Sequence, residues 1–248
     1  EPRSPMIPPR SKDCCGDSPG MDTGASGSGT PSEIESESAF RWRRWPIALR
    51  PYTVSVLMVV KDPTWLDEAM SSLVAQTYDS MEVVCLADGG MGLTVGLNRA
   101  ARLARGTRYL ARLDADDLAY PGRLARQVAY LDAHPEMVVC GTWAHRADSH
   151  GQIRGLVMPD PSWLPHCNPL IHSSVLIRRE AFDAVGGYDD TLAVCQDFDL
   201  WLRLMGVGSV GIIPEPWVIV REHPGQVSRR AWRRRRAQWV IRRRHARA

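Results

Sequence analysis

Short apolar runs alternate with helical patterns between residues 53 and 143, and this alternation constrains the fold more than any other feature. Each run is nearly free of charge and rich in aliphatic residues, which is typical of a strand buried on both faces of a sheet. We expect strands at 53–60, 82–87, 109–113 and 137–143, with helices at 64–76, 93–105 and 121–133. The pattern predicts an α/β fold with a mostly parallel sheet flanked by helices.

The second half of the chain is less regular. Residues 148–168 are rich in Pro and Gly and show no clear periodicity, so we expect an irregular segment there. The elements expected after it are a short strand at 173–178, a helical turn at 180–185, a helix at 196–205, and strands at 207–213 and 217–220.

Three carboxylates directly follow the third expected strand. They are Asp114, Asp116 and Asp117. Parallel strands bring their carboxyl ends to one edge of the sheet, where open α/β folds bind ligands. Carboxylates this close repel one another unless a cation or hydrogen-bond donors compensate, and their hard oxygens suit Mg²⁺ or Mn²⁺. The alternative is a solvated turn in which one Asp caps the next helix.

A second polar turn is expected at the same edge. Asp88-Gly89-Gly90 ends the second strand, which places a carboxylate beside the cation site. Such a neighbourhood is what nucleotide binding requires.

The ends of the chain differ from its centre in composition. Pro, Gly, Ser and Asp dominate residues 1–50, which predicts a disordered segment, although the basic and aromatic stretch 39–49 could lie against the domain or a membrane. Residues 51–228 are expected to form a single catalytic domain. Residues 229–248 hold ten Arg and no acidic residue, whereas the rest of the chain carries a net charge of about −7.

The Arg-rich tail has two interpretations. Its apolar residues among the arginines predict either a basic amphipathic helix at an anionic membrane surface or a solvated, partner-binding tail. A nucleic-acid partner is not expected, because no recognisable reader module accompanies the arginines. No apolar run approaches the roughly 20 residues of a membrane span. Cys85 and Cys140 lie in apolar runs and indicate reduced thiols, so we expect a cytoplasmic protein, with a peripheral location at the inner face of the membrane as the alternative.

Taken together, the motifs resemble those of the family 2 glycosyltransferases, which have the GT-A fold. The matching stretches keep the family's order and are residues 54–57, 72–78, 111–117, 123–127, 172–179, 186–189, 196–204 and 221–223. The resemblance implies a metal-dependent, inverting transfer of a sugar from a nucleotide-diphosphate sugar to an acceptor nucleophile. It also implies a nucleotide-binding half, 51–145, and an acceptor or catalytic half, 146–228.

The resemblance assigns roles to individual residues. Asp114 and Asp116 match the family's DxD motif, with Asp116 the expected direct ligand of Mn²⁺ or Mg²⁺. Asp88 matches the residue that contacts the nucleotide base, and Asp197 matches the general base. His223 falls where some members place a His near the metal and diphosphate.

The chain also departs from the family pattern. Ala87 replaces a frequent first Asp, and Gln196 replaces the Glu that usually precedes the base. Lys61 stands near the place of a missing aromatic residue and is expected to contact phosphate or ribose. These changes leave the fold and the reaction class as expected, and they leave the donor nucleotide open.

Several side chains have two interpretations. Asp197 is either the base or a helix cap, and Asp199 is either an alternative base or a structural hydrogen-bonding group. His172 either lines the acceptor side or is a satisfied polar core residue. Three tryptophans could stack on a sugar, and they are Trp163, Trp201 and Trp217. Trp201 is expected in the core. A metal site formed by His166, Cys167, His172 and Cys195 is not expected, because the spacing matches no familiar pattern.

Two other functions remain as alternatives. A nucleotidyltransferase would share the architecture and the acidic metal site, but it would more typically show a Gly-rich basic loop after the first strand. A degenerate transferase would keep the fold as a nucleotide-sugar-binding scaffold, and Ala87 and Gln196 keep that alternative open.

Overall fold

The structure is a computed structural model that describes residues 39–43, 52–104, 106–164, 166–224 and 231–245. The chain divides into two compact units, 1–37 and 38–248, and all described residues belong to the second. Most of the segment that we predict to be disordered, 1–50, therefore lies outside the described residues.

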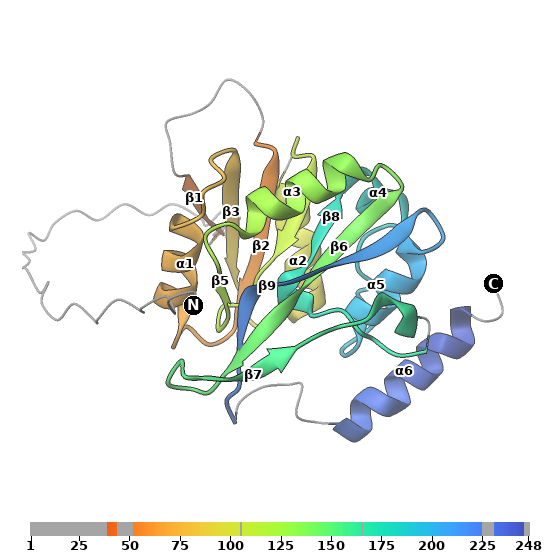
Figure 1. The fold of residues 1–248 in the computed structure, drawn as a ribbon. Coiled ribbons are helices and arrows are strands. Elements are labelled where there is room, and N and C mark those ends of the chain that lie inside the picture. Colours follow the sequence, from red (N-terminus) through yellow and green to blue (C-terminus); the bar gives the residue numbers. More distant parts are fainter. Residues whose placement is uncertain (1–38, 44–51, 105, 165, 225–230, 246–248) are drawn as a thin grey trace, which may run out of the picture. The chain divides into compact units, whose positions relative to one another are not determined.

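The described strands form one mixed sheet in the order β1-β3-β2-β4-β8-β6-β9-β5, with β7 paired to β6 (Figure 1). Their bounds are β1 Ala39–Arg43, β2 Val54–Val60, β3 Met81–Ala87, β4 Tyr109–Arg112, β5 Leu118–Ala119, β6 Met137–Ala147, β7 Ile153–Val157, β8 Leu176–Arg178 and β9 Ser209–Arg221. Strand β2 is parallel to β3 and β4, and β6 is parallel to β9. These three ladders contain more paired residues than the antiparallel ones, so the expected mostly parallel sheet is confirmed.

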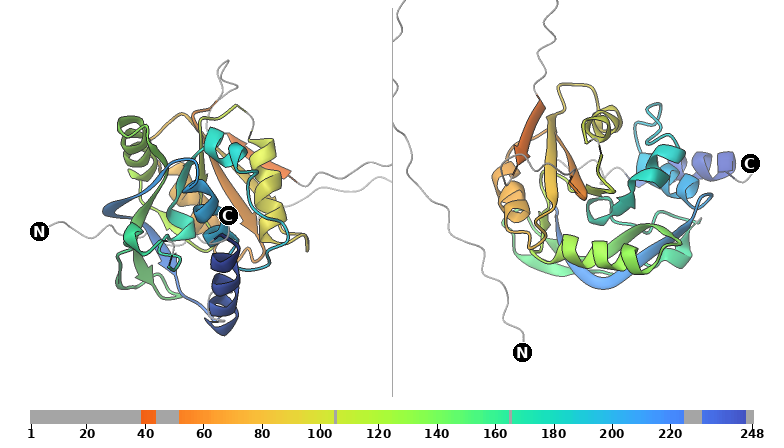
Figure 2. Two further views of the ribbon diagram at one scale, coloured as in Figure 1. Left: turned by 90° about the vertical axis from the view of Figure 1, so that its right-hand side faces the viewer. Right: turned by 90° about the horizontal axis from the view of Figure 1, so that it is seen from above.

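Helices cover both faces of this sheet, and the sheet curls around the helices on one of the two faces (Figure 2). The helices are α1 Leu66–Val74, α2 Leu93–Leu103, α3 Arg123–Ala133, α4 Arg179–Ala184, α5 Gln196–Leu204 and α6 Ala231–His245, with short 3₁₀ turns at η1 Pro161–Trp163 and η2 His172–Ser174. Helices α1 and α3 contribute to one hydrophobic core, and α2, α4 and α5 contribute to the other.

Strand β2 shows why these residues form a central strand. Val56 and Met58 point into the core on the α1 side, whereas Leu57 and Val59 point into the core on the α2 side. All four are almost completely buried. Side chains that alternate between two apolar layers require an apolar residue at every position, which is the pattern in the sequence.

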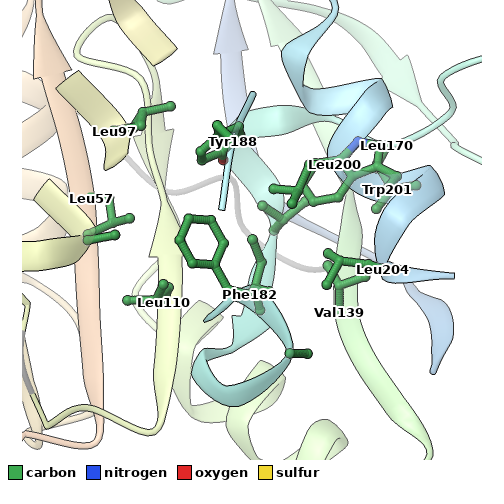
Figure 3. Close-up of a cluster of buried hydrophobic side chains, with 14 of the residues drawn as sticks. Leu57, Leu97, Leu110, Val139, Leu170, Phe182, Tyr188, Leu200, Trp201 and Leu204 are labelled. Carbon is green, nitrogen blue, oxygen red and sulfur yellow. The ribbon is translucent and has the colours of Figure 1, made fainter. Parts of the chain in front are cut away.

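The core on the α2 side joins the two halves of the domain. Leu57 and Leu97 come from the first half, and Phe182 and Trp201 come from the second (Figure 3). Trp201 is fully buried, as expected for a core residue. Burying a large apolar side chain stabilises the fold by about 1.5–3 kcal/mol, so this layer holds the two halves in a fixed relation.

The structure differs from the expected elements in four strands. Strands β1, β5 and β7 were not expected, and each lies at an edge of the sheet or pairs through few residues. Strand β9 is continuous, whereas the sequence predicts two strands separated by Pro214 and Pro216. Proline cannot donate a ladder hydrogen bond, and the β6–β9 register shifts around Trp143, opposite these prolines. The irregularity accommodates them without ending the strand.

The Arg-rich tail is not a free extension where it is described. Ile241 of α6 is only 2% exposed, and Ala237 packs against the same core. His245 Nε2 lies 2.9 Å from Asp199 Oδ1 of α5, and Arg244 pairs with Asp189 at 2.9 Å. Helix α6 is thus docked on the domain through one of its faces. None of the described helices has the length and apolar character needed to cross a membrane.

We expect Ile241→Ala to lower the free energy of unfolding by about 2 kcal/mol, because a buried aliphatic side chain leaves a cavity. Val240 is its neighbour on the same helix and is 51% exposed, so Val240→Ala serves as the matched control, with a change within about 0.5 kcal/mol. Urea unfolding of the two variants measures the difference. Equal effects would show that α6 does not pack through Ile241.

Candidate active site

The polar residues predicted to form a site meet at one edge of the sheet. In the order β3-β2-β4, Ala87 pairs with Val60 and Arg112 pairs with Leu57, so the three strands end close together. Asp88 and Lys61 directly follow the ends of β3 and β2, and the acidic turn follows β4. The carboxyl edge of these parallel strands is therefore where a ligand would bind.

The acidic turn brings three carboxylates into one cluster. Asp114, Asp116 and Asp117 each offer an oxygen atom, and these atoms lie within 4.8 Å of one another. In the described part of the chain, this is the one group of His, Cys, Asp or Glu side chains whose geometry could hold a metal ion.

Asp114 is held by two residues that the sequence analysis did not single out. The Arg112 guanidinium binds Asp114 Oδ1, and the Ser173 hydroxyl donates to Asp114 Oδ2 at 2.8 Å. Burial raises the pKa of Asp114, but the charges of Arg112 and His172 and the hydrogen bonds outweigh burial, so its pKa lies below the usual value. Asp114 therefore stays ionised even where solvent access is limited.

Arg112 is itself buried beneath the turn, with a residue exposure of 1%. It binds the carbonyl oxygen of Leu113, and Arg123 Nη2 donates to the carbonyl oxygen of Arg112 at 2.8 Å. Arg123 is also fully buried; burial, together with the nearby charge of Arg112, lowers its pKa to about 9. Two arginines thus place positive charge under three carboxylates. A charged residue inside an otherwise apolar strand is the sequence signal that could have identified Arg112.

Asp117 has the opposite electrostatic situation. It is buried and accepts a hydrogen bond from the backbone N–H of Arg221 at 2.9 Å. Burial and then the charges of Asp114 and Asp116 raise the pKa of Asp117 well above its usual value. Neighbouring carboxylates with pKa values pushed apart are typical of a functional site, and a bound cation would relieve the repulsion.

Asp116 differs from Asp114 in having one carboxylate oxygen that no described residue binds. Its Oδ2 lies 2.9 Å from His223 Nε2, and its Oδ1 makes no hydrogen bond to any described residue. The His223 ring packs against Trp65, with the ring centroids 4.5 Å apart. Arg221 Nε donates to the backbone carbonyl of Asp116 at 3.1 Å. The end of β9 therefore fixes the turn while leaving one Asp116 oxygen free to bind.

Asp88 organises the glycine-rich turn after β3. Its backbone N–H donates to the carbonyl of Val60 at 2.8 Å, and its Oδ1 accepts from the N–H of Gly92 at 2.9 Å. Gly89 and Gly90 have positive φ angles, which non-glycine residues rarely adopt. The Lys61 side chain is exposed at the same edge. The structure thus brings Asp88 and Lys61 together at the edge that holds the acidic turn.

Asp197 stands in the first turn of α5, where the sequence predicts it. The helix begins after Cys195, which has a φ of 59° and is the one non-glycine residue of the described chain with a positive φ. Such a conformation costs about 1–3 kcal/mol and is often found at functional sites. Asn168 Nδ2 donates to Asp197 Oδ2 at 2.6 Å, a contact that the sequence did not indicate. Asn168 fixes the carboxylate and leaves its Oδ1 without a partner among the described residues.

A His–Tyr pair, in which Tyr188 is buried and His172 partly buried, lies near both the acidic turn and Asp197. His172 Nε2 and the Tyr188 hydroxyl are 2.8 Å apart. Burial, followed by the charge of Arg112, lowers the pKa of His172 to about 4, although the carboxylates of Asp197 and Asp114 oppose this shift. His172 is therefore neutral at physiological pH, and both Asp114 and Asp197 are close enough to act on it.

Two of the remaining candidate residues, Asp199 and Trp217, are hydrogen-bonded to other side chains of the domain. Asp199 is buried, and its two oxygens bind Arg203 and His245 at 2.8 and 2.9 Å. Trp217 donates to Glu215 at 2.8 Å, and Trp163 is 53% exposed. These contacts give Asp199 and Trp217 roles in packing and hydrogen bonding.

Comparison with known proteins identifies the family. The model of "Glycosyl transferase family 2" matches residues 87–186, which include the acidic turn and the His172 segment. The amylovoran biosynthesis glycosyltransferase AmsE of Erwinia amylovora is 30% identical over 204 residues, covering 68% of this chain and 76% of that protein. The putative glycosyltransferase EpsE of Bacillus subtilis is 28% identical over 214 residues, covering 72% and 76%.

Two solved structures share the fold. One is S. aureus TarS 1–349 in complex with UDP-GlcNAc, with a TM-score of 0.59, 14% identity, and coverage of 76% of this chain and 66% of that chain. The other is the mannosyltransferase PcManGT from Pyrobaculum calidifontis in complex with GDP-Man and Mn²⁺, with a TM-score of 0.56, 19% identity, and coverage of 80% and 65%. This chain thus spans about two thirds of the length of each solved chain.

The sequence relatives show the family, and the solved structures share the fold. This chain belongs to glycosyltransferase family 2 and is a glycosyltransferase with a GT-A-like fold.

Proposed function

We propose that this glycosyltransferase is metal-dependent and inverting, and that it transfers a sugar from a nucleotide-diphosphate sugar to an acceptor nucleophile with Asp197 as the general base. The observation that carries the proposal is the three-carboxylate cluster, in which Asp114 is kept ionised and Asp117 is forced toward protonation. Such a cluster is stabilised by a cation. The fold neighbour PcManGT, crystallised with GDP-Man and Mn²⁺, supports this combination of ligands.

The residues of the acidic turn fit a hard divalent cation, because they supply only carboxylate oxygens. Asp116 and Asp114 would hold Mn²⁺ or Mg²⁺, with His223 beside them at 2.9 Å from Asp116. The bound ion would supply Lewis-acid stabilisation of the charge that develops on the departing nucleoside diphosphate.

Asp88 and Lys61 would bind the donor in the nucleotide-binding half, 51–145. Asp88 is fixed by its hydrogen bonds to Val60 and Gly92, which suits a carboxylate that must hold one orientation to recognise a nucleotide base. Exposed Lys61 supplies a positive charge at the same edge, where it would meet phosphate or ribose.

Asp197 would act from the second half of the domain, 146–228. An acceptor hydroxyl is a weak nucleophile, so a carboxylate within hydrogen-bond reach must take its proton. Asn168 holds Asp197 Oδ2 at 2.6 Å and thereby orients the carboxylate. His172, whose pKa is lowered to about 4, is neutral at physiological pH and places no positive charge beside Asp197. A single base and direct displacement would invert the anomeric configuration.

The proposed metal dependence is tested by a donor screen. We expect release of nucleoside diphosphate from at least one UDP- or GDP-sugar, dependent on Mn²⁺ or Mg²⁺ and abolished by chelation. Asp116→Asn keeps the side-chain volume and should lower this release about 100-fold or more, because it removes a charged ligand. Asp183→Asn, which alters a 54% exposed carboxylate on α4, is the matched control. Undiminished release from Asp116→Asn, or release unaffected by chelation, would contradict the proposal.

The assignment of the base is tested by Asp197→Asn. We expect this variant to bind the nucleoside diphosphate as the wild type does in calorimetry, yet to turn over the donor identified in the screen about 10²–10⁴-fold more slowly. The asparagine retains an oxygen that can accept the Asn168 hydrogen bond, so the site should keep its geometry. Wild-type turnover in Asp197→Asn would show that another group takes the proton.

A further inference from the structure

Helix α6 has an outer face that the fold does not use. We define this face by Arg236, Trp239, Val240 and Arg243, which recur at i, i+3, i+4 and i+7 and therefore lie along one side of the helix. All four are exposed, with Trp239 at 48% and Val240 at 51%. Exposed large apolar residues beside arginines indicate an interaction surface.

The opposite side of α6 is occupied, so the outer face has a fixed direction. Ala237 and Ile241 pack on the core, and His245 contacts Asp199. Arg242 Nη1 donates to the carbonyl of His166 at 2.9 Å, and Arg244 pairs with Asp189. Because these contacts hold the helix on α5, turning Trp239 and Val240 inward would require giving up the buried Ile241 side chain.

Charge and apolar area coincide on the outer face. The guanidinium carbon of Arg243 lies 4.0 Å from the centroid of the Trp239 ring, which keeps a positive charge directly over an exposed aromatic side chain. By sequence, the segment 229–248 holds ten Arg and no Asp or Glu. The surface therefore complements a partner that presents both negative charge and an apolar interior.

We propose that the outer face of α6 binds the surface of an anionic phospholipid bilayer, with Trp239 and Val240 entering the interfacial region and Arg236 and Arg243 contacting lipid headgroups. A helix with basic and apolar residues on its exposed side binds such an interface in two ways. Its apolar side chains are buried among the lipids, and its basic side chains are attracted to the anionic headgroups. Nucleic acid would engage the arginines, and a base could stack on Trp239, but an exposed valine at the centre of the face has no role there.

The docked position of α6 gives this contact a consequence for the enzyme. Helix α6 packs on α5, the helix whose first turn carries Asp197, and His245 binds Asp199 two residues further along. A bilayer bound by α6 would therefore hold the acceptor half of the domain at a fixed orientation to the lipid surface. The lipid contact itself does not depend on the proposed transfer reaction, so the two proposals fail separately.

The test is co-sedimentation of the full chain with sucrose-loaded vesicles of phosphatidylcholine alone or of phosphatidylcholine with phosphatidylglycerol. We expect binding to the anionic vesicles only, weakened by added salt. The double variant Arg236→Glu with Arg243→Glu should reduce binding by roughly tenfold or more. Trp239→Ser with Val240→Ser should reduce it several-fold, since it removes apolar area without changing charge.

Matched controls separate the outer face from general charge and exposure. Arg102→Glu changes an exposed arginine on α2, and Val74→Ser changes a residue on α1 that is 59% exposed. Both controls should bind as the wild type does, and all variants should keep their thermal unfolding transitions. The proposal is overturned if the full chain binds neutral and anionic vesicles equally or not at all. It is also overturned if the face variants bind like the controls, or if they lose binding to duplex DNA but not to vesicles.

Discussion

The contact between buried Arg112 and Asp114 is the interaction on which the site depends. Three carboxylates within four residues would repel one another at the end of a buried strand. The Arg112 guanidinium below them partly compensates this negative charge. Arg112 keeps one carboxylate ionised, while burial and the remaining charges push Asp117 toward protonation. The turn is thereby left with an unbalanced charge at its open side, where Asp116 has a free oxygen.

Elements that are far apart in the sequence build this arrangement. Ser173 holds Asp114, the N–H of Arg221 holds Asp117, and Arg123 supports the carbonyl of Arg112. Each comes from a different segment, and the two hydrophobic cores on either side of the sheet fix those segments relative to one another. The core on the α2 side also positions α5, so the proposed base and the acidic turn belong to one framework.

Local patterns in the sequence predicted the central strands, the helices and the acidic turn, because periodicity and short motifs report on residues close together in the chain. The hydrogen-bond partners of the site residues could not be predicted from such local patterns. Asn168 meets Asp197 across 29 positions and Ser173 meets Asp114 across 59, and nothing in the local sequence marks either pairing. The continuity of β9 was not predicted for a different reason: extra residues of β9 opposite Trp143 accommodate the two prolines within the strand, which depends on the pairing with β6. The docking of α6 rests on Ile241, one apolar residue among arginines, whose burial depends on a tertiary surface that the tail itself does not specify.

The central claim is that the acidic turn after β4 binds the divalent cation of the donor complex. Diffraction at the manganese absorption edge, from crystals grown with Mn²⁺ and UDP or GDP, tests it most directly. We predict an anomalous peak coordinated by Asp116 and by the diphosphate, with the nucleotide extending toward Asp88. A nucleotide bound with no peak at that turn, or a peak at another site, would contradict it.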